Sequence, residues 1–125
     1  MELKKNKILS ILVIAALIFI LISPSEAIAF TNIQSYSNEN HTFTSSWSES
    51  KTINYSGSTC VLTYGFDTTL INEDYAYAYS NGSLHRSKIT NYNGSFFGYW
   101  VYANDWSDKE VTHRGTSIYY YHQWE

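Results

Sequence analysis

Apolar and polar residues alternate along several stretches of this chain, and a period of two residues is typical of β-strands. Tyrosine and alanine alternate strictly over residues 75–79, and residues 60–66 place Cys, Leu, Tyr and Phe at every second position. Aromatic and β-branched side chains of this kind fit a pleated sheet. We therefore expect an all-β protein. Its predicted strands include residues 60–66, 75–79, 83–92, 95–103 and 111–124, the last with a break at Gly115.

Two Asn-Gly pairs, at 81–82 and 93–94, separate three of these segments and predict tight turns. Asn and Gly tolerate the positive φ angles of a type I′ turn, so each pair is expected to form a two-residue hairpin loop. Residues 75–103 would then fold as a three-stranded meander in which Tyr79 faces Leu84. One face of that meander would present Tyr75, Tyr77, Tyr79, Leu84, Arg86, Lys88, Phe97, Tyr99 and Val101.

A second layer is expected because a three-stranded sheet buries little apolar surface. Residues 60–66 and 117–124 would form it, which gives a small antiparallel β-sandwich of hairpins. Residues 104–110 are predicted to be a polar connection. Residues 30–59, rich in Ser, Thr and Asn, fit either a loosely ordered leader or one or two weak strands. The predicted structural core contains Trp100, Ile118, Tyr120 and Trp124.

The first 29 residues have the organisation of a secretory signal peptide. Lys4, Lys5 and Lys7 precede an apolar run over residues 8–22, and small residues precede a cleavage site near Ala29. The alternative is a retained membrane anchor, but this run is 15 residues long and a spanning helix needs about 20. We therefore expect a cleavable signal-peptide helix, a secreted product and no stable membrane span after cleavage.

The expected organisation is thus a signal peptide over residues 1–29, a leader over 30–59 and one β domain over 60–125. The chain from residue 30 onward carries five basic and nine acidic side chains. Nucleic acid is therefore not expected as a partner, because its phosphates require a basic surface. Cys60 is the only cysteine, which excludes an internal disulfide and favours a small buried side chain over a reactive thiol.

Catalysis finds little support in the sequence, and no catalytic residue, metal site or cofactor is expected. The four histidines lack the spacing of zinc ligands, and no Gly-x-Ser-x-Gly nucleophile motif is present. Paired carboxylates can hydrolyse glycosides, so a small hydrolase that uses Asp105, Asp108 or Glu110 is an alternative. Acidic residues in a polar segment are more often a solvated turn.

The predicted face of tyrosines and cations is the best candidate for a binding surface. Aromatic rings stack on sugar rings, and the cations Arg86 and Lys88 can hold a phosphate. The alternative interpretation is cross-strand cation–π pairing that only stabilises the sheet. The candidate target-binding residues are Tyr75, Tyr77, Arg86, Lys88 and Tyr99.

Several short motifs follow one another over residues 60–124: Tyr64-Gly65, Ala78-Tyr79-Ser80-Asn81, His85, Ser87, Ile89, Gly98-Tyr99-Trp100-Val101, Ala103 and the ending Ser117–Trp124. In their order and spacing these motifs resemble the lactococcin 972 family of secreted bacteriocins. A second histidine that this family usually has near His85 is missing, and Arg86 and Lys88 are there instead.

The resemblance implies a non-catalytic β-sandwich that is secreted to inhibit related Gram-positive bacteria. It further implies an envelope target, the cell-wall precursor lipid II, with inhibition of cell-wall and septum synthesis, and a dedicated ABC-type immunity transporter as a partner in the producer. The alternative function is a secreted, non-catalytic module that binds cell-wall polysaccharide or another carbohydrate.

Overall fold

The computed structural model describes residues 32–125, and these residues form eight β-strands and no helix. The predicted signal peptide lies outside the described residues. Among residues 32–125 there is accordingly no helix long and apolar enough to cross a membrane. The strands are β1 (Asn32–Ser37), β2 (Trp47–Tyr55), β3 (Ser58–Asp67), β4 (Glu73–Ser80), β5 (His85–Asn91), β6 (Gly94–Phe97), β7 (Trp106–Thr112) and β8 (Tyr119–Trp124).

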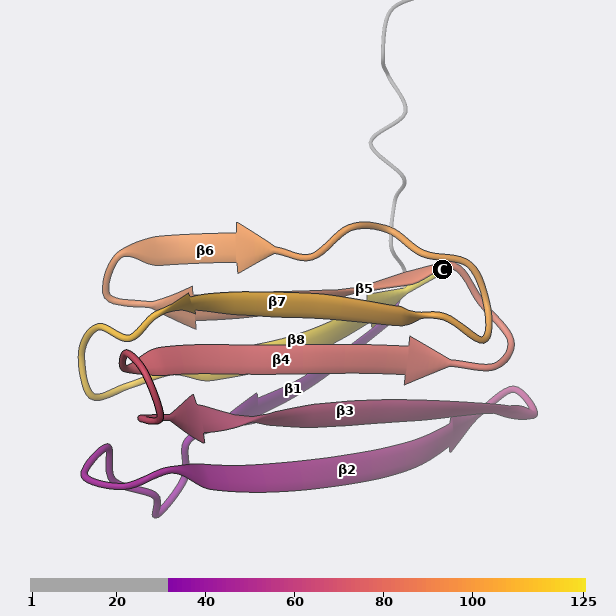
Figure 1. Ribbon diagram of the computed structural model, residues 1–125. Coiled ribbons are helices and arrows are strands. Elements are labelled where there is room, and N and C mark those ends of the chain that lie inside the picture. Colours follow the sequence, from indigo (N-terminus) through magenta and orange to yellow (C-terminus); the bar gives the residue numbers. More distant parts are fainter. Residues whose placement is uncertain (1–31) are drawn as a thin grey trace, which may run out of the picture.

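Two four-stranded antiparallel sheets pack face to face, which confirms the predicted β-sandwich (Figure 1). The first sheet has the strand order β1-β8-β5-β6, and the second has the order β2-β3-β4-β7. Residues 32–59 supply β1 and β2, one to each sheet, so this part of the chain takes the ordered alternative of the two expected.

The core lies between the sheets and is formed by the inward side chains of strands that alternate in burial. Its buried members include Leu62 and Tyr64 of β3, Ile89 of β5 and Tyr120 of β8. Of the four residues predicted to form the core, Ile118, Tyr120 and Trp124 are buried, whereas Trp100 is only half-buried.

The predicted hairpin at 81–82 is wrong. β4 pairs with β3 and β7, whereas β5 pairs with β6 and β8, so the chain crosses from one sheet to the other at this point. Neither Asn81 nor Gly82 has a positive φ, so no type I′ turn forms. Asn81 instead continues the pairing with β3, because its backbone N–H donates to the Thr59 carbonyl and its side chain accepts from the Thr59 N–H at 2.8 Å.

The second predicted hairpin is present, with its loop one residue earlier. Asn91 pairs with Gly94, so the loop is Tyr92-Asn93, and Lys88 faces Phe97 rather than Tyr99. The Asn91 side chain accepts a hydrogen bond from the Asn93 N–H at 2.9 Å and so stabilises this turn. A type I′ turn forms where none was predicted, at 56–57 between β2 and β3, where both φ angles are positive.

Two further expectations about the strands are wrong. Residues 60–66 and 117–124 do not share a layer, because β3 lies in the second sheet and β8 in the first. Residues 104–110 are not a plain connection, because most of β7 falls within them. β7 is an edge strand whose only fully buried side chain is Ser107, so it has no apolar periodicity to reveal it.

Candidate functional site

The five predicted target-binding residues do not share one surface. The four of them that lie on strands point outward, as the alternation predicts. However, Tyr75 and Tyr77 point outward from the second sheet, whereas Arg86 and Lys88 point outward from the first. The structure therefore divides the expected binding face into two surfaces on opposite sides of the sandwich.

Arg86 lies on the outer surface of the first sheet and is fixed by its neighbours. Its Nε donates a hydrogen bond to Oε1 of Gln123 at 2.7 Å. Its guanidinium carbon lies 4.2 Å from the ring centroid of Phe97 and 4.6 Å from that of Trp100. Partial burial against these rings lowers the pKa of Arg86 from its ordinary value. The rings therefore hold the guanidinium in one place and shield one side of it from water.

Lys88, two residues further along β5, lies between aromatic residues of the two flanking strands. Its Nζ is 4.7 Å from the ring centroid of Tyr121 and 5.3 Å from that of Phe97. Both rings belong to the cross-strand partners of Lys88. We call this surface the basic face; it consists of Arg86, Lys88, Phe97, Trp100 and Tyr121.

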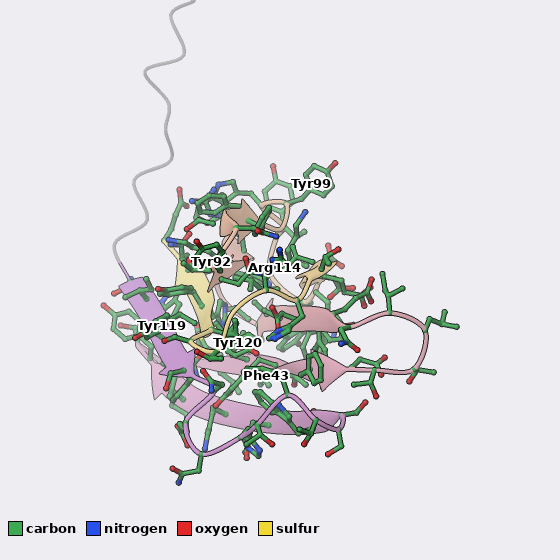
Figure 2. The ribbon with its side chains drawn as sticks, turned by 90° about the vertical axis from the view of Figure 1, so that its left-hand side faces the viewer. Phe43, Tyr92, Tyr99, Arg114, Tyr119 and Tyr120 are labelled. Carbon is green, nitrogen blue, oxygen red and sulfur yellow. The ribbon has the colours of Figure 1, made fainter. Side chains whose placement is uncertain are left out.

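Tyr99 belongs to neither the Tyr75–Tyr77 pair nor the Arg86–Lys88 pair. It lies in the connection between β6 and β7, its side chain is 89% exposed, and it projects away from the sheets (Figure 2). The backbone is held there, because the Tyr99 carbonyl accepts a hydrogen bond from Oγ of Ser107 at 2.7 Å. The fixed backbone leaves the ring accessible next to Trp100 of the basic face.

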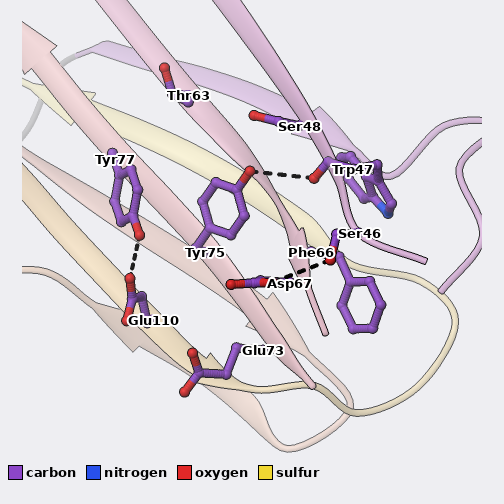
Figure 3. A pocket seen from close by; sticks show the side chains of 10 residues that line it. All are labelled: Ser46, Trp47, Ser48, Thr63, Phe66, Asp67, Glu73, Tyr75, Tyr77 and Glu110. Carbon is purple, nitrogen blue, oxygen red and sulfur yellow. Dashed lines mark hydrogen bonds between the residues drawn. The ribbon is translucent and has the colours of Figure 1, made fainter. Parts of the chain in front are cut away.

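The outer surface of the second sheet contains an open cleft of about 600 Å³ (Figure 3). The rings of Tyr75 and Tyr77 stack there with their centroids 5.1 Å apart and their planes 27° from parallel. Carboxylates from three different segments, Asp67, Glu73 and Glu110, also line it. We call this the tyrosine cleft.

A glycine makes room for the tyrosine cleft. Gly65 on β3 is the cross-strand partner of Tyr75, and a Cβ atom there would lie 2.2 Å from the Trp47 carbonyl oxygen and 2.6 Å from Oη of Tyr75. Tyr75 therefore lies across β3 and donates a hydrogen bond to the Trp47 carbonyl at 3.3 Å. Sequence reasoning missed Gly65, although a glycine inside an alternating strand often marks such a close approach.

The charged groups of the tyrosine cleft differ in how they are held. Oη of Tyr77 donates a hydrogen bond to Glu110, and burial together with this carboxylate raises the pKa of Tyr77. The hydroxyl and backbone N–H of Thr69 donate to Asp67 and lower its pKa. Glu73 is half-buried, and its side chain makes no hydrogen bond or ion pair within residues 32–125.

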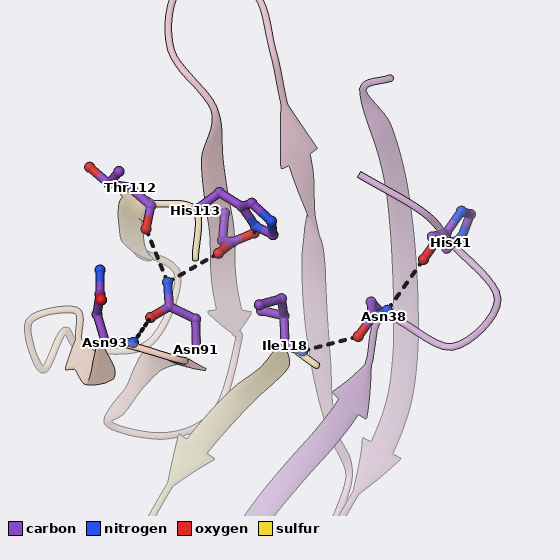
Figure 4. A network of polar contacts seen from close by, with 8 residues as sticks. Asn38, His41, Asn91, Asn93, Thr112, His113 and Ile118 are labelled. Carbon is purple, nitrogen blue, oxygen red and sulfur yellow. Dashed lines mark hydrogen bonds and ion pairs between the residues drawn. The ribbon is translucent and has the colours of Figure 1, made fainter. Parts of the chain in front are cut away.

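A third polar site is a histidine–carboxylate pair at one end of the sandwich (Figure 4). Nδ1 of His113 lies 2.8 Å from Oδ1 of the buried Asp74, and Nδ2 of Asn91 donates to Oδ2 of Asp74 at 3.2 Å. Burial raises the pKa of Asp74, and the bonds from His113 and Asn91 oppose that shift. This network connects β4, β5 and the end of β7, so it fixes their positions.

Metal coordination has no support in the described part of the chain. Residues 32–125 contain no cluster of three or more His, Cys, Asp or Glu side chains placed to hold a metal ion. Of the carboxylates of the hydrolase alternative, Asp108 and Glu110 are consecutive outward residues of β7, and Asp105 precedes that strand.

Comparisons with protein-family models, with curated proteins and with solved structures give no match for this chain.

Proposed function

We propose that this protein is a secreted antibacterial protein, without catalytic activity, that binds an anionic component of the bacterial cell envelope through its basic face. The observation that carries the proposal is the pair of cations on neighbouring outward positions of β5, each set against aromatic rings. Its function would then depend on binding alone.

Charge distribution supports this proposal. Only five basic side chains occur after residue 29, against nine acidic ones, and two of the five are Arg86 and Lys88. A guanidinium and an ammonium two residues apart on one strand face the same direction. Their N–H groups can donate charge-assisted hydrogen bonds to neighbouring oxygens of a phosphate or pyrophosphate. The aromatic contacts keep both side chains ordered, so less entropy is lost when the anion binds.

The resemblance of residues 60–124 to the lactococcin 972 family suggests which anion this is. That resemblance implies lipid II, whose pyrophosphate would lie against Arg86 and Lys88. Sequestration of this precursor would stop cell-wall and septum synthesis in related Gram-positive bacteria. The producing cell would then need protection, for which a dedicated ABC-type transporter is the proposed partner.

Vesicle binding tests the proposal. Purified protein is sedimented with neutral phospholipid vesicles that contain lipid II and with matched vesicles that lack it, and the same preparation is placed on lawns of related Gram-positive bacteria. We expect binding only to the vesicles with lipid II, together with zones of growth inhibition. Equal sedimentation with both vesicles, or the absence of inhibition, would contradict the proposal.

A further inference from the structure

The tyrosine cleft is on the side of the sandwich opposite to the basic face, so the anion proposed above leaves it unexplained. We infer that the tyrosine cleft is a second binding site, for a saccharide that carries a free ammonium group. The stacked rings of Tyr75 and Tyr77 would receive the sugar, and the carboxylate of Glu73 would receive the ammonium.

The shape of the cleft fits a sugar ring. Tyr75 and Tyr77 are consecutive outward residues of β4, and their rings stack on each other and line the hollow with aromatic surface. Carbon-bound hydrogens of a pyranose pack on aromatic faces, while the surrounding hydroxyls need hydrogen-bonding partners. Ser46, Ser48 and Thr63 line the same cleft and carry hydroxyls that can supply such partners.

The charges in the cleft select the kind of sugar. Asp67 and Glu73 are directly opposite each other on β3 and β4, and like charges in that arrangement destabilise a sheet. Glu110 adds a third carboxylate, and none of the ten residues that line the cleft is Lys or Arg. These groups are not placed to hold a metal ion. A cationic group on a larger ligand would relieve the repulsion.

Glu73 is the carboxylate best placed to receive the ammonium. Hydrogen bonds within the protein already occupy the carboxylates of Asp67 and Glu110, whereas the carboxylate of Glu73 has no partner within residues 32–125. An ammonium that binds there would form a charge-assisted hydrogen bond in a half-buried position, where water screens the interaction less than at the open surface.

Titration with oligosaccharides tests this inference. Purified protein is titrated with a β-1,4-linked glucosamine hexamer, with its fully N-acetylated counterpart and with a glucose hexamer of the same linkage, in mildly acidic buffer. We expect the glucosamine hexamer to bind at least about tenfold more tightly than the other two, as one charge-assisted hydrogen bond implies. Equal binding of the three sugars, or no binding of the glucosamine hexamer, would overturn the inference.

Matched variants separate a specific site from general attraction between a polycation and an acidic protein. Glu73→Gln keeps the shape of the side chain and should lower the affinity for the glucosamine hexamer about tenfold. Glu125→Gln removes the same charge at an exposed position directly after β8 and should leave this affinity unchanged. Equal losses in the two variants, or competition by hexalysine at equal concentration, would show non-specific attraction and contradict the inference.

Two substitutions of Tyr77 test whether its aromatic ring contributes to binding of the sugar. Tyr77→Phe retains the ring and should retain most of the binding, whereas Tyr77→Ala should abolish it, with folding of both variants checked by circular dichroism. Unchanged affinity in a folded Tyr77→Ala protein would overturn the inference. Arg86→Ala/Lys88→Ala lies on the other side of the molecule and should bind the hexamer normally, so failure of the basic face and failure of the cleft are distinguishable.

Discussion

The rings of Tyr64 and Tyr120 meet between the two sheets, with centroids 4.8 Å apart and both side chains almost fully buried. Tyr64 belongs to β3 of the second sheet and Tyr120 to β8 of the first, so this contact joins the two layers at the centre of the core. Both hydroxyl groups are buried without a hydrogen-bond partner within residues 32–125. Burial raises the pKa of Tyr64 to about 12.

This contact predicts opposite effects for two substitutions of Tyr120. Tyr120→Ala removes the buried ring and should lower the free energy of unfolding by about 3–5 kcal/mol. Tyr120→Phe removes only the unsatisfied hydroxyl and should raise it by about 1 kcal/mol. Urea denaturation followed by tryptophan fluorescence measures both values. A Tyr120→Phe protein less stable than the wild type would show that the hydroxyl has a partner, such as an internal water.

Trp124 closes one end of the same interface. It is 3% exposed, and its ring centroid lies 5.0 Å from that of His122 and 5.7 Å from that of Tyr55. Trp124→Ala should therefore lower the free energy of unfolding by about 3–5 kcal/mol. The matched control is Trp106→Ala. Trp106 is 48% exposed on the edge strand β7, so this substitution should lower the free energy of unfolding far less. A loss for Trp124→Ala as small as that for Trp106→Ala, measured by thermal denaturation, would contradict this role of Trp124.

His122 makes stability depend on pH. It is fully buried, its ring nitrogens have no hydrogen-bond partner within residues 32–125, and burial together with the nearby His85 lowers its pKa from 6.5 to about 3. Between these two values the unfolded chain binds a proton at His122 and the folded protein does not. The stability that neutral His122 contributes is therefore complete above about pH 6.5 and is lost as the pH falls toward 3.

Denaturation over that pH range tests the role of His122. As the pH changes, His122 can alter the free energy of unfolding by at most about 1.4 kcal/mol per pH unit. His122→Leu removes the titrating group, so the wild type should lose more stability than this variant between pH 6.5 and 4. Parallel curves for the two proteins would show that His122 does not control this part of the pH dependence.

Cys60 is expected to be chemically inert in the folded protein. Its side chain is fully buried, and burial raises the pKa of its thiol. Only the thiolate reacts with disulfide reagents, so labelling should be negligible in native buffer and complete in denaturant. Rapid labelling of the native protein, or dimers that a reducing agent separates, would contradict this expectation.

The direction of the side chains along each strand could be predicted from the sequence, but the pairing of the strands could not. A two-residue period shows which side chains point inward, and this is correct for Ala76 and Ala78 of β4 and for His85 and Ser87 of β5. It does not show which strands pair, because pairing depends on residues distant in the sequence. Pairing with Thr59 keeps Asn81 in line with the second sheet and out of the expected turn.

The same limit applies to the candidate sites. Arg86, Lys88, Tyr75 and Tyr77 stand out from the sequence because cations and tyrosines alternate there, yet they divide between two sheets. Glu110 could not be assigned to the tyrosine cleft, because β7 shows no apolar pattern and its pairing with β4 is non-local.

The basic face is tested most directly by comparing two variants that lose the same charge. Arg86→Ala/Lys88→Ala removes both cations of β5, and Lys109→Ala/Arg114→Ala removes two cations in and after β7. Binding to vesicles with lipid II is measured for both, after their folding is checked by circular dichroism. We expect a loss of affinity of about a hundredfold for the first variant and little change for the second. Equal losses in the two, or full affinity in the first, would contradict this expectation.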